Sequence, residues 1–234
     1  MRDAAVDAGF AVAERLNRVG LGGVTTRARR AAARLGGGRH TVDADGVALT
    51  GSLAEHGPYL RAAAASGHPL QTRLMAGAVR PGATVVDCGA HLGLQSLLAA
   101  RAAGADGRII AIEAAPRNVV YLRENVAANG FADRIEVVAK AAAETPGEVL
   151  IHVAESIDQS GVVRDRQSPR TIPVAATTID EILGDEGFDV AKVDVEGAEA
   201  LVLAGARGAL GRSRGASLFV ECHPFRLADL GTDP

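Results

Sequence analysis

Acidic residues stand at the ends of several short apolar runs in this sequence, at positions where they could act together on one ligand. Asp87 ends the first of these runs and precedes a loop that holds Gly89 and Gly93. Glu113 ends the next run, IIAI, and Asp194 ends a later one, AKV. A strand that breaks into a glycine loop just before a helix has the geometry of a cofactor-binding loop. These residues predict a small-molecule site where the strands end.

The loop from Gly89 to Gly93 favours one kind of cofactor over another. The loop lacks the middle glycine of a dinucleotide fingerprint. In addition, the Asp87 carboxylate would face the negatively charged pyrophosphate of a dinucleotide, so the loop does not fit such a ligand. S-adenosylmethionine has no phosphate and carries a sulfonium and an ammonium, which the Asp87 carboxylate would favour electrostatically. Gly89 would let the backbone approach this ligand without a Cβ in the way. Glu113 could accept hydrogen bonds from both ribose hydroxyls, with a solvated acid at a strand end as the alternative.

Two later segments place polar side chains near other strand ends. In KVDVEGAE, Asp194 ends a strand, and Glu196 and Glu199 lie where the next helix begins; the helix dipole alone would favour Glu199 there. In VECHP, His223 follows the last apolar run. The carboxyl ends of parallel strands share one crevice, so His223 is expected to join the acids there, with a structural histidine as the alternative. The side chains expected to converge are Asp87, Glu113, Asp194 and His223.

The elements that must position these residues are strands alternating with helices. This alternation is the form of βαβ units and predicts an α/β fold with a doubly wound, mostly parallel sheet. A helix at 69–79 leads into it. Additional strands are expected at 148–153 and 171–179, with 155–170 between them as a flexible loop or substrate flap. The expected strands of the main sheet are 83–87, 108–113, 134–139, 189–194 and 216–221.

An N-terminal extension, residues 1–67, is expected ahead of the α/β domain of residues 68–234. It combines an amphipathic helix at 4–19 with a hairpin at 40–50, whose Asp-Gly dipeptide favours a tight two-residue turn. The net charge of -3 argues against a general polyanion binder, but the extension has an arginine run without acids. This run could touch phosphate, lipid headgroups or nucleic acid, or could be a solvated arm. Its members are Arg15, Arg18, Arg27, Arg29, Arg30, Arg34 and Arg39.

The composition is that of one globular domain. Of the 234 residues, 47% are hydrophobic and only 3% aromatic, which suits strands covered by helices. No stretch reaches the roughly 18 uninterrupted apolar residues of a transmembrane helix. Acids within the first 14 residues interrupt the apolar region that a secretory signal needs, so a cytoplasmic protein is expected. Cys88 and Cys222 are expected to be buried small hydrophobes, too far apart for a disulfide.

Five segments resemble, in order and spacing, the successive motifs of the FkbM-type methyltransferase family. The resemblance covers roughly residues 68–224, and the run DVEGAE is its most specific part. It implies a class I, Rossmann-like methyltransferase that uses S-adenosylmethionine, usually on hydroxyl groups of sugars, polyketides or related secondary metabolites. The segments are VVDCGAHLGLQSLLAA, IIAIEAAPRNVVYLRENVAAN, TTIDEI, KVDVEGAEALVLAGA and LFVECHP.

The motif match also implies roles for individual residues. Ala142 would lie near the adenine and Asp194 near the methionine end of the cofactor. The family commonly has asparagine where this chain has His91, which departs from the pattern. The residues that would line the cofactor are Asp87, Gly89, Ala90, His91, Gly93 and Glu113.

The sequence continues for 13 residues after Glu221, whereas sheets of this kind normally add a helix and a closing antiparallel hairpin. Bare sheet edges invite pairing. The far edge is therefore expected either to be missing or to be covered by the N-terminal hairpin, by the strands at 148–153 and 171–179, or by a second subunit in a homo-oligomer.

The expected reaction is methyl transfer to an oxygen of a small-molecule acceptor. A hydroxyl loses its proton during attack, so a base would speed the step; the candidates, in order, are His223, Asp194, Glu196 and His91. A carboxylate acceptor would need no base. Asp194 and Glu196 have no evident third partner for Mg²⁺, so no metal is expected. RNA methylation and non-catalytic cofactor binding also remain open, although few aromatics and the net charge weigh against nucleic acid.

Overall fold

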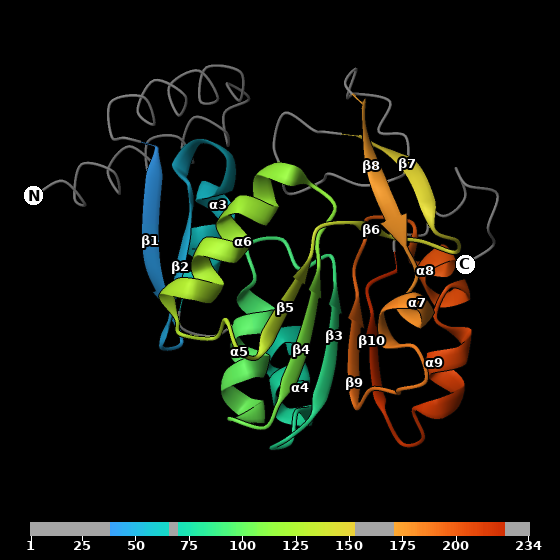
Figure 1. The fold of residues 1–234 in the computed structure, drawn as a ribbon. Helices are drawn as coiled ribbons and strands as arrows, with labels where there is room; N and C mark the ends of the chain where they lie inside the picture. Colours follow the sequence, from blue (N-terminus) through green and yellow to red (C-terminus); the bar gives the residue numbers. More distant parts are fainter. Residues whose placement is uncertain (1–37, 66–69, 153–170, 223–234) are drawn as a thin grey trace, which may run out of the picture.

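The computed structural model describes residues 38–65, 70–152 and 171–222. A five-stranded parallel sheet is its centre, in the order β10-β9-β3-β4-β5 (Figure 1). The strands are β3 (Thr84–Cys88), β4 (Arg108–Ile112), β5 (Ile135–Val138), β9 (Val190–Val193) and β10 (Ser217–Val220). All five predicted strands are confirmed, and so is the doubly wound α/β fold.

Both faces of this sheet are buried, because successive side chains of a strand point to opposite faces and helices cover each one. Val85 and Ile109 join a cluster with α4 (Leu70–Ala78), α5 (Leu94–Ala103) and α6 (Pro116–Ala128). Their neighbours Val86 and Ile110 join a second cluster on the other face. The helices of that face are α7 (Ile179–Leu183), α8 (Glu199–Ala204) and α9 (Arg207–Arg212).

The two additional strands exist but do not extend the main sheet. With β6 (Ala141–Ala142), β7 (Gly147–His152) and β8 (Thr171–Thr177) form a separate three-stranded sheet, order β6-β8-β7. Figure 1 shows it above the carboxyl end of the main sheet. Of the alternatives for the far edge, coverage by these strands is therefore wrong, because β8 pairs with β6 and β7 instead. Among the described residues, β10 pairs only with β9.

The predicted hairpin is confirmed as β1 (Arg39–Ala44) and β2 (Val47–Ser52). Its turn residues Asp45 and Gly46 have φ values of 57° and 78°, as a two-residue turn with positive φ at both positions requires. The hairpin pairs only within itself, so it does not cover the edge at β10 either. Together with α3 (Leu53–Ala64) it packs against α6 and the sheet, in one hydrophobic cluster with them.

Two asparagines, Asn125 of α6 and Asn129 at its C-cap, hold the outer edge of β2. Asn125 accepts a hydrogen bond from the Thr50 backbone N–H and donates to its carbonyl, at 2.8 and 3.0 Å. Asn129 repeats this with Ala48, at 2.9 and 2.8 Å. Each side-chain amide thus exchanges the two bonds that a neighbouring strand would supply, which satisfies backbone groups that a bare edge would leave open.

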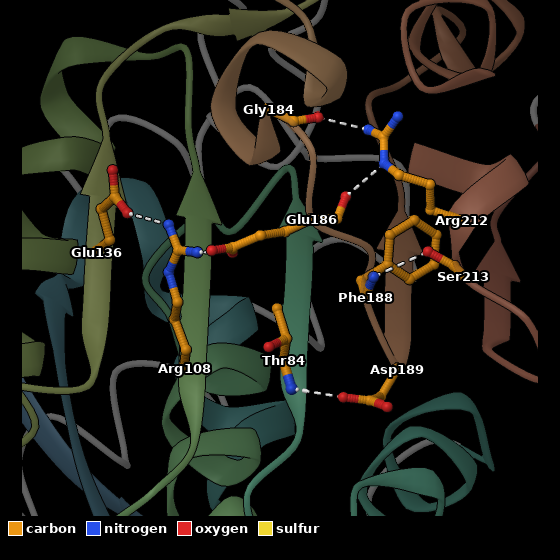
Figure 2. Close-up of polar contacts among 9 residues, drawn as sticks. All are labelled: Thr84, Arg108, Glu136, Gly184, Glu186, Phe188, Asp189, Arg212 and Ser213. Carbon is orange, nitrogen blue, oxygen red and sulfur yellow. Dashed lines mark hydrogen bonds and ion pairs between the residues drawn. The ribbon is translucent and has the colours of Figure 1, made fainter. Parts of the chain in front are cut away.

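Polar contacts hold the amino ends of the strands together, opposite the predicted site (Figure 2). Arg108 lies between the carboxylates of Glu136 and Glu186, at 3.3 and 2.5 Å. Asp189 accepts from the Thr84 backbone N–H at 2.8 Å. These side chains are largely exposed, and exposed pairs contribute about 0–1 kcal/mol each.

The cysteine prediction is half right. Cys88 is buried, and burial raises the pKa of its thiol to about 12. Cys222 is exposed, because it follows the end of edge strand β10. Both are free, with β9 between their strands.

Several expectations fall outside the described residues: the helix at 4–19, most of the arginine run, the loop at 155–170 and His223. The domain boundary at residues 67 and 68 stays a prediction. In the described ranges, no helix is both long and apolar enough to cross a bilayer.

We expect Asn129→Ala to lower the free energy of unfolding by about 1–3 kcal/mol, because two part-buried backbone groups of Ala48 lose their partner. The measurement is urea unfolding followed by circular dichroism, since the chain has no tryptophan. Arg123→Ala, an exposed change on the same helix, is the control and should stay within about 0.5 kcal/mol. Equal losses in both variants would contradict this role of Asn129.

Candidate functional site at the carboxyl ends of the strands

The predicted crevice lies where the winding of the sheet reverses. From β3 the chain proceeds to β4 and β5 on one side, whereas β9 and β10 lie on the other. The helix after β3 and the helix after β9 cover opposite faces, so the loops that follow these two strands diverge. This switch point is the usual ligand position in open α/β sheets.

Both loops contain a strained residue. His91 after β3 and Glu196 after β9 have φ values of 54° and 58°, a region that side chains with a Cβ rarely adopt. The third such residue among those described is Asp45, in the hairpin turn. Such strain persists only where the surrounding structure enforces it, and it concentrates at functional sites.

Gly89 makes room for protein atoms. A Cβ on Gly89 would lie 1.8 Å from the backbone oxygen of Asp194, so the loops after β3 and β9 touch here. A Cβ on Gly93 would likewise lie 2.5 Å from Leu122 of α6. Both glycines are needed for packing within the protein, whereas the contact with a ligand expected of Gly89 stays a prediction.

A buried lysine, which the sequence analysis missed, connects Asp87 and Asp194, two of the predicted acids. Lys192 Nζ lies 3.3 Å from Asp87 and 3.5 Å from Asp194, and donates to the Gly89 carbonyl at 3.0 Å. The side chain of Lys192 is 6% exposed and that of Asp87 is 0% exposed, whereas Asp194 keeps 26%. Burial alone would lower the pKa of Lys192, but the two carboxylates raise it overall, so the ammonium stays charged.

Asp87 is therefore committed within the protein. It accepts from Ser96 at 2.6 Å in addition to its ion pair with Lys192. The sequence did contain a signal for the contact between Lys192 and Asp194, namely a lysine within the apolar run VAKV. The two residues are two positions apart, so their side chains lie on the same face of the strand.

Glu113 is held by three donors. The backbone N–H of His91 reaches one carboxylate oxygen at 2.8 Å, and the Ala115 N–H and Asn118 Nδ2 reach the other at 2.9 and 3.1 Å. Burial raises the pKa of Glu113, and these hydrogen bonds oppose that effect. A carboxylate has about four acceptor positions, which leaves Glu113 about one for a ligand.

His91 packs its ring against two residues of α3. The ring centroids lie 4.4 Å from Tyr59 and 5.3 Å from His56, both edge-on. Burial is the largest cause that lowers the pKa of His91 to about 3, and the nearby Lys192 ammonium adds to it, so the His91 ring is neutral at neutral pH and a poor general base. Its Nε2 is buried and has no hydrogen-bond partner within the described residues, which is uncommon for a buried polar atom.

The structure thus brings most of the predicted residues to one end of the sheet. Ala90 is anchored there with Gly89, since both backbone N–H groups donate to the Ile112 carbonyl at 3.0 and 2.9 Å. Ala142 is buried in β6, directly after β5. Glu199 accepts from the Gly197 N–H at 2.8 Å, a contact within the turn that starts α8. In the described part of the chain, no three His, Cys, Asp or Glu side chains gather as metal ligands would.

Residues 87–233 match the family model described as "Methyltransferase FkbM domain", which is more than half of the chain. No curated protein matches the sequence. The methyltransferase FkbM from Methylobacillus flagellatus is a similar solved structure, with 23% identity and a TM-score of 0.45 over 68% of this chain and 42% of that one.

Two more solved structures are similar at lower identity. The O-methyltransferase from Bacillus cereus, in complex with SAH, has 19% identity and a TM-score of 0.40, over 67% of this chain and 57% of that one. A SAM-dependent methyltransferase from Thiobacillus denitrificans, in complex with S-adenosyl-L-homocysteine, has 18% identity and a TM-score of 0.40, over 65% and 47%. The chain spans about half the length of the solved structures that it matches.

Gly89→Ala is expected to cost about 3 kcal/mol or more, because a Cβ would overlap the Asp194 carbonyl in addition to the strain of a positive φ. Gly82→Ala is the matched control: Gly82 has the same φ of 78°, but a Cβ there would meet nothing within 4 Å. It should cost only the strain, about 1–2 kcal/mol. Equal unfolding free energies for the two variants would contradict the close contact at Gly89.

Lys192→Met is expected to cost about 3–5 kcal/mol, because it leaves the buried Asp87 carboxylate without its cation. The double variant Asp87→Asn, Lys192→Met should lose less than the sum of the two single variants, since the uncompensated charge is removed as well. Arg108→Met, which breaks two exposed ion pairs of about 0–1 kcal/mol each, is the control and should cost about 2 kcal/mol or less. Additive losses in the unfolding measurements would show that Lys192 and Asp87 do not interact.

Proposed function

Since the chain belongs to the methyltransferase FkbM family, we propose that it transfers a methyl group from S-adenosylmethionine to a hydroxyl oxygen of a small molecule. The observation that carries this proposal is the family match from residue 87 onward. The matched stretch includes the glycine loop, Glu113 and the DVEGAE run, all of which lie at the carboxyl ends of β3, β4 and β9.

The charges of the site fit a cationic ligand. Three carboxylates, of Asp87, Glu113 and Asp194, stand against the single ammonium of Lys192, so the site is negative when all are ionised. Asp87 is fully buried, whereas Asp194 is the more accessible of the pair that shares Lys192. We therefore assign to Asp194 the contact with the positively charged methionine end of the cofactor.

The ribose end fits the remaining polar groups. Glu113 keeps about one acceptor position after its three internal bonds, enough for one ribose hydroxyl, whereas the sequence alone pointed to both. Ala142, buried after β5, is the proposed neighbour of the adenine.

The bound cofactor would supply a methyl group already activated by its sulfonium. The protein then has to hold the acceptor oxygen in line and exclude water. Asp194 and Glu196, at the end of β9 and in the strained turn after it, are the described candidates for accepting the proton of the hydroxyl. His223 remains the first candidate base from the sequence, and the low pKa of His91 removes that residue from the role.

We propose a sugar, a polyketide or a related secondary metabolite as the acceptor and the cytoplasm as the compartment. The one described member of the arginine run does not support nucleic acid as the methyl acceptor. Arg39 pairs with Glu124 at 2.7 Å and lies over the ring of Tyr121, so its charge is used within the protein.

The test is calorimetry with S-adenosylhomocysteine, followed by transfer of labelled methyl from S-adenosylmethionine to hydroxyl and carboxyl acceptors. We expect Asp194→Asn to weaken S-adenosylhomocysteine binding about 10-fold or more, as the loss of a charged contact does. Asp189→Asn, at the opposite end of β9, is the control and should bind as the parent does. Absence of binding to the parent protein would overturn the proposed function, and transfer to carboxyl acceptors alone would correct its chemistry.

A further inference from the structure

The segment formed by β1, β2 and α3 precedes the part of the chain that matches the family model, yet it reaches the site. His56 of α3 is fully buried, with its ring 5.3 Å from His91 and 5.2 Å from Tyr121. Tyr59, one turn further along α3, lies 4.4 Å from His91. A helix from outside the matched region therefore packs directly on the loop that follows β3.

The hydrogen bonds of His56 determine which of its ring nitrogens carries the proton. The Ser52 backbone N–H donates to Nδ1 at 2.9 Å, so Nδ1 is an acceptor and the neutral ring carries its proton on Nε2. Nε2 lies 3.3 Å from Asn118 Oδ1 and donates to it. With its oxygen thus engaged, Asn118 turns its Nδ2 to Glu113, to which it donates at 3.1 Å.

We propose that His56 is a positioning residue, which acts through Asn118 to hold the Glu113 carboxylate in place for the adenosyl ligand. This makes the hairpin and α3 a working part of the cofactor site, and it rests on the function proposed above. The three residues His56, Asn118 and Glu113 are called the relay below.

The relay is also linked to His91 in the loop after β3. Glu113 also accepts from the His91 N–H, and the His91 ring in turn packs on the His56 ring. Moving α3 would therefore disturb Asn118 and His91 together, and through them both oxygens of Glu113. All three side chains of the relay are buried, where an unmade hydrogen bond costs about 1–3 kcal/mol.

Coupling of this kind is reciprocal. If the docked α3 holds Glu113 in its ligand-binding orientation, the ligand must stabilise the docked state of α3 by the same free energy. S-adenosylhomocysteine is therefore expected to slow amide hydrogen exchange in β2 and α3, although neither belongs to the main sheet.

Two variants interrupt the relay and two leave it intact. His56→Phe keeps a ring but removes both nitrogens, and Asn118→Ala breaks the middle link while the Ser52 contact remains. His56→Gln retains one donor and one acceptor and should rescue the relay. Asn129→Ala removes two hydrogen bonds to the Ala48 backbone, away from the relay, and controls for loss of stability while α3 stays docked.

The first measurement needs no ligand. Carbon-detected NMR titration of Glu113, assigned by the signal lost in Glu113→Gln, should show a higher pKa in His56→Phe and in Asn118→Ala, because the carboxylate loses a donor. His56→Gln and Asn129→Ala should titrate as the parent does. An unchanged Glu113 titration in Asn118→Ala, or in a folded His56→Phe, overturns the proposal.

The second measurement is calorimetry with S-adenosylhomocysteine. His56→Phe and Asn118→Ala should bind about 5- to 10-fold more weakly, the worth of about one hydrogen bond, and the other two variants within about 2-fold of the parent. Equal affinity in all variants overturns the proposal while the function stands. If the parent does not bind but the Glu113 titration responds to His56, the function fails while the link from α3 to Glu113 stands.

Discussion

The site depends on the pairing of buried charges at the point where β3 and β9 end. Burying a carboxylate without a cation would cost several kcal/mol of desolvation. Lys192 solves this by meeting Asp87, Asp194 and the Gly89 carbonyl with a single ammonium. The same contacts hold the two diverging loops against each other. The close approach of Gly89 to Asp194 follows from this arrangement.

Around this centre, polar side chains at the site find partners in distant parts of the chain. Glu113 holds the loop after β3 through His91 and the start of α6 through Ala115. Asn125 ties α6 to β2 and also donates to the Leu92 carbonyl at 2.9 Å. The N-terminal hairpin, α6 and the glycine loop therefore form one connected unit. Membership in the FkbM methyltransferase family gives this unit its proposed task, which is to hold the adenosyl end of a methyl donor.

Much of the fold could be predicted from local patterns. The five apolar runs became the five parallel strands, and the Asp-Gly dipeptide became a tight turn with positive φ at both residues. The predictions failed where the pairing of a strand or the exposure of a residue depended on its neighbours in space. The strands β7 and β8 were recognised, but the far edge of the main sheet was one of the places considered for them, whereas they pair with β6 and with each other. Cys222 was expected to be buried, but it lies exposed just beyond an edge strand.

The sequence by itself determined which residues lie at the carboxyl ends of the strands, because strand periodicity and glycine loops are encoded by neighbouring residues. Only the tertiary structure decided what those residues contact. Lys192 meets Asp87 across 105 positions of the chain, and His56 meets Asn118 across 62. Partners so distant in sequence leave no local pattern. The same residue types thus predicted a carboxylate open to the ligand at Asp87, whereas the folded chain uses that charge internally and leaves Asp194 the more accessible one.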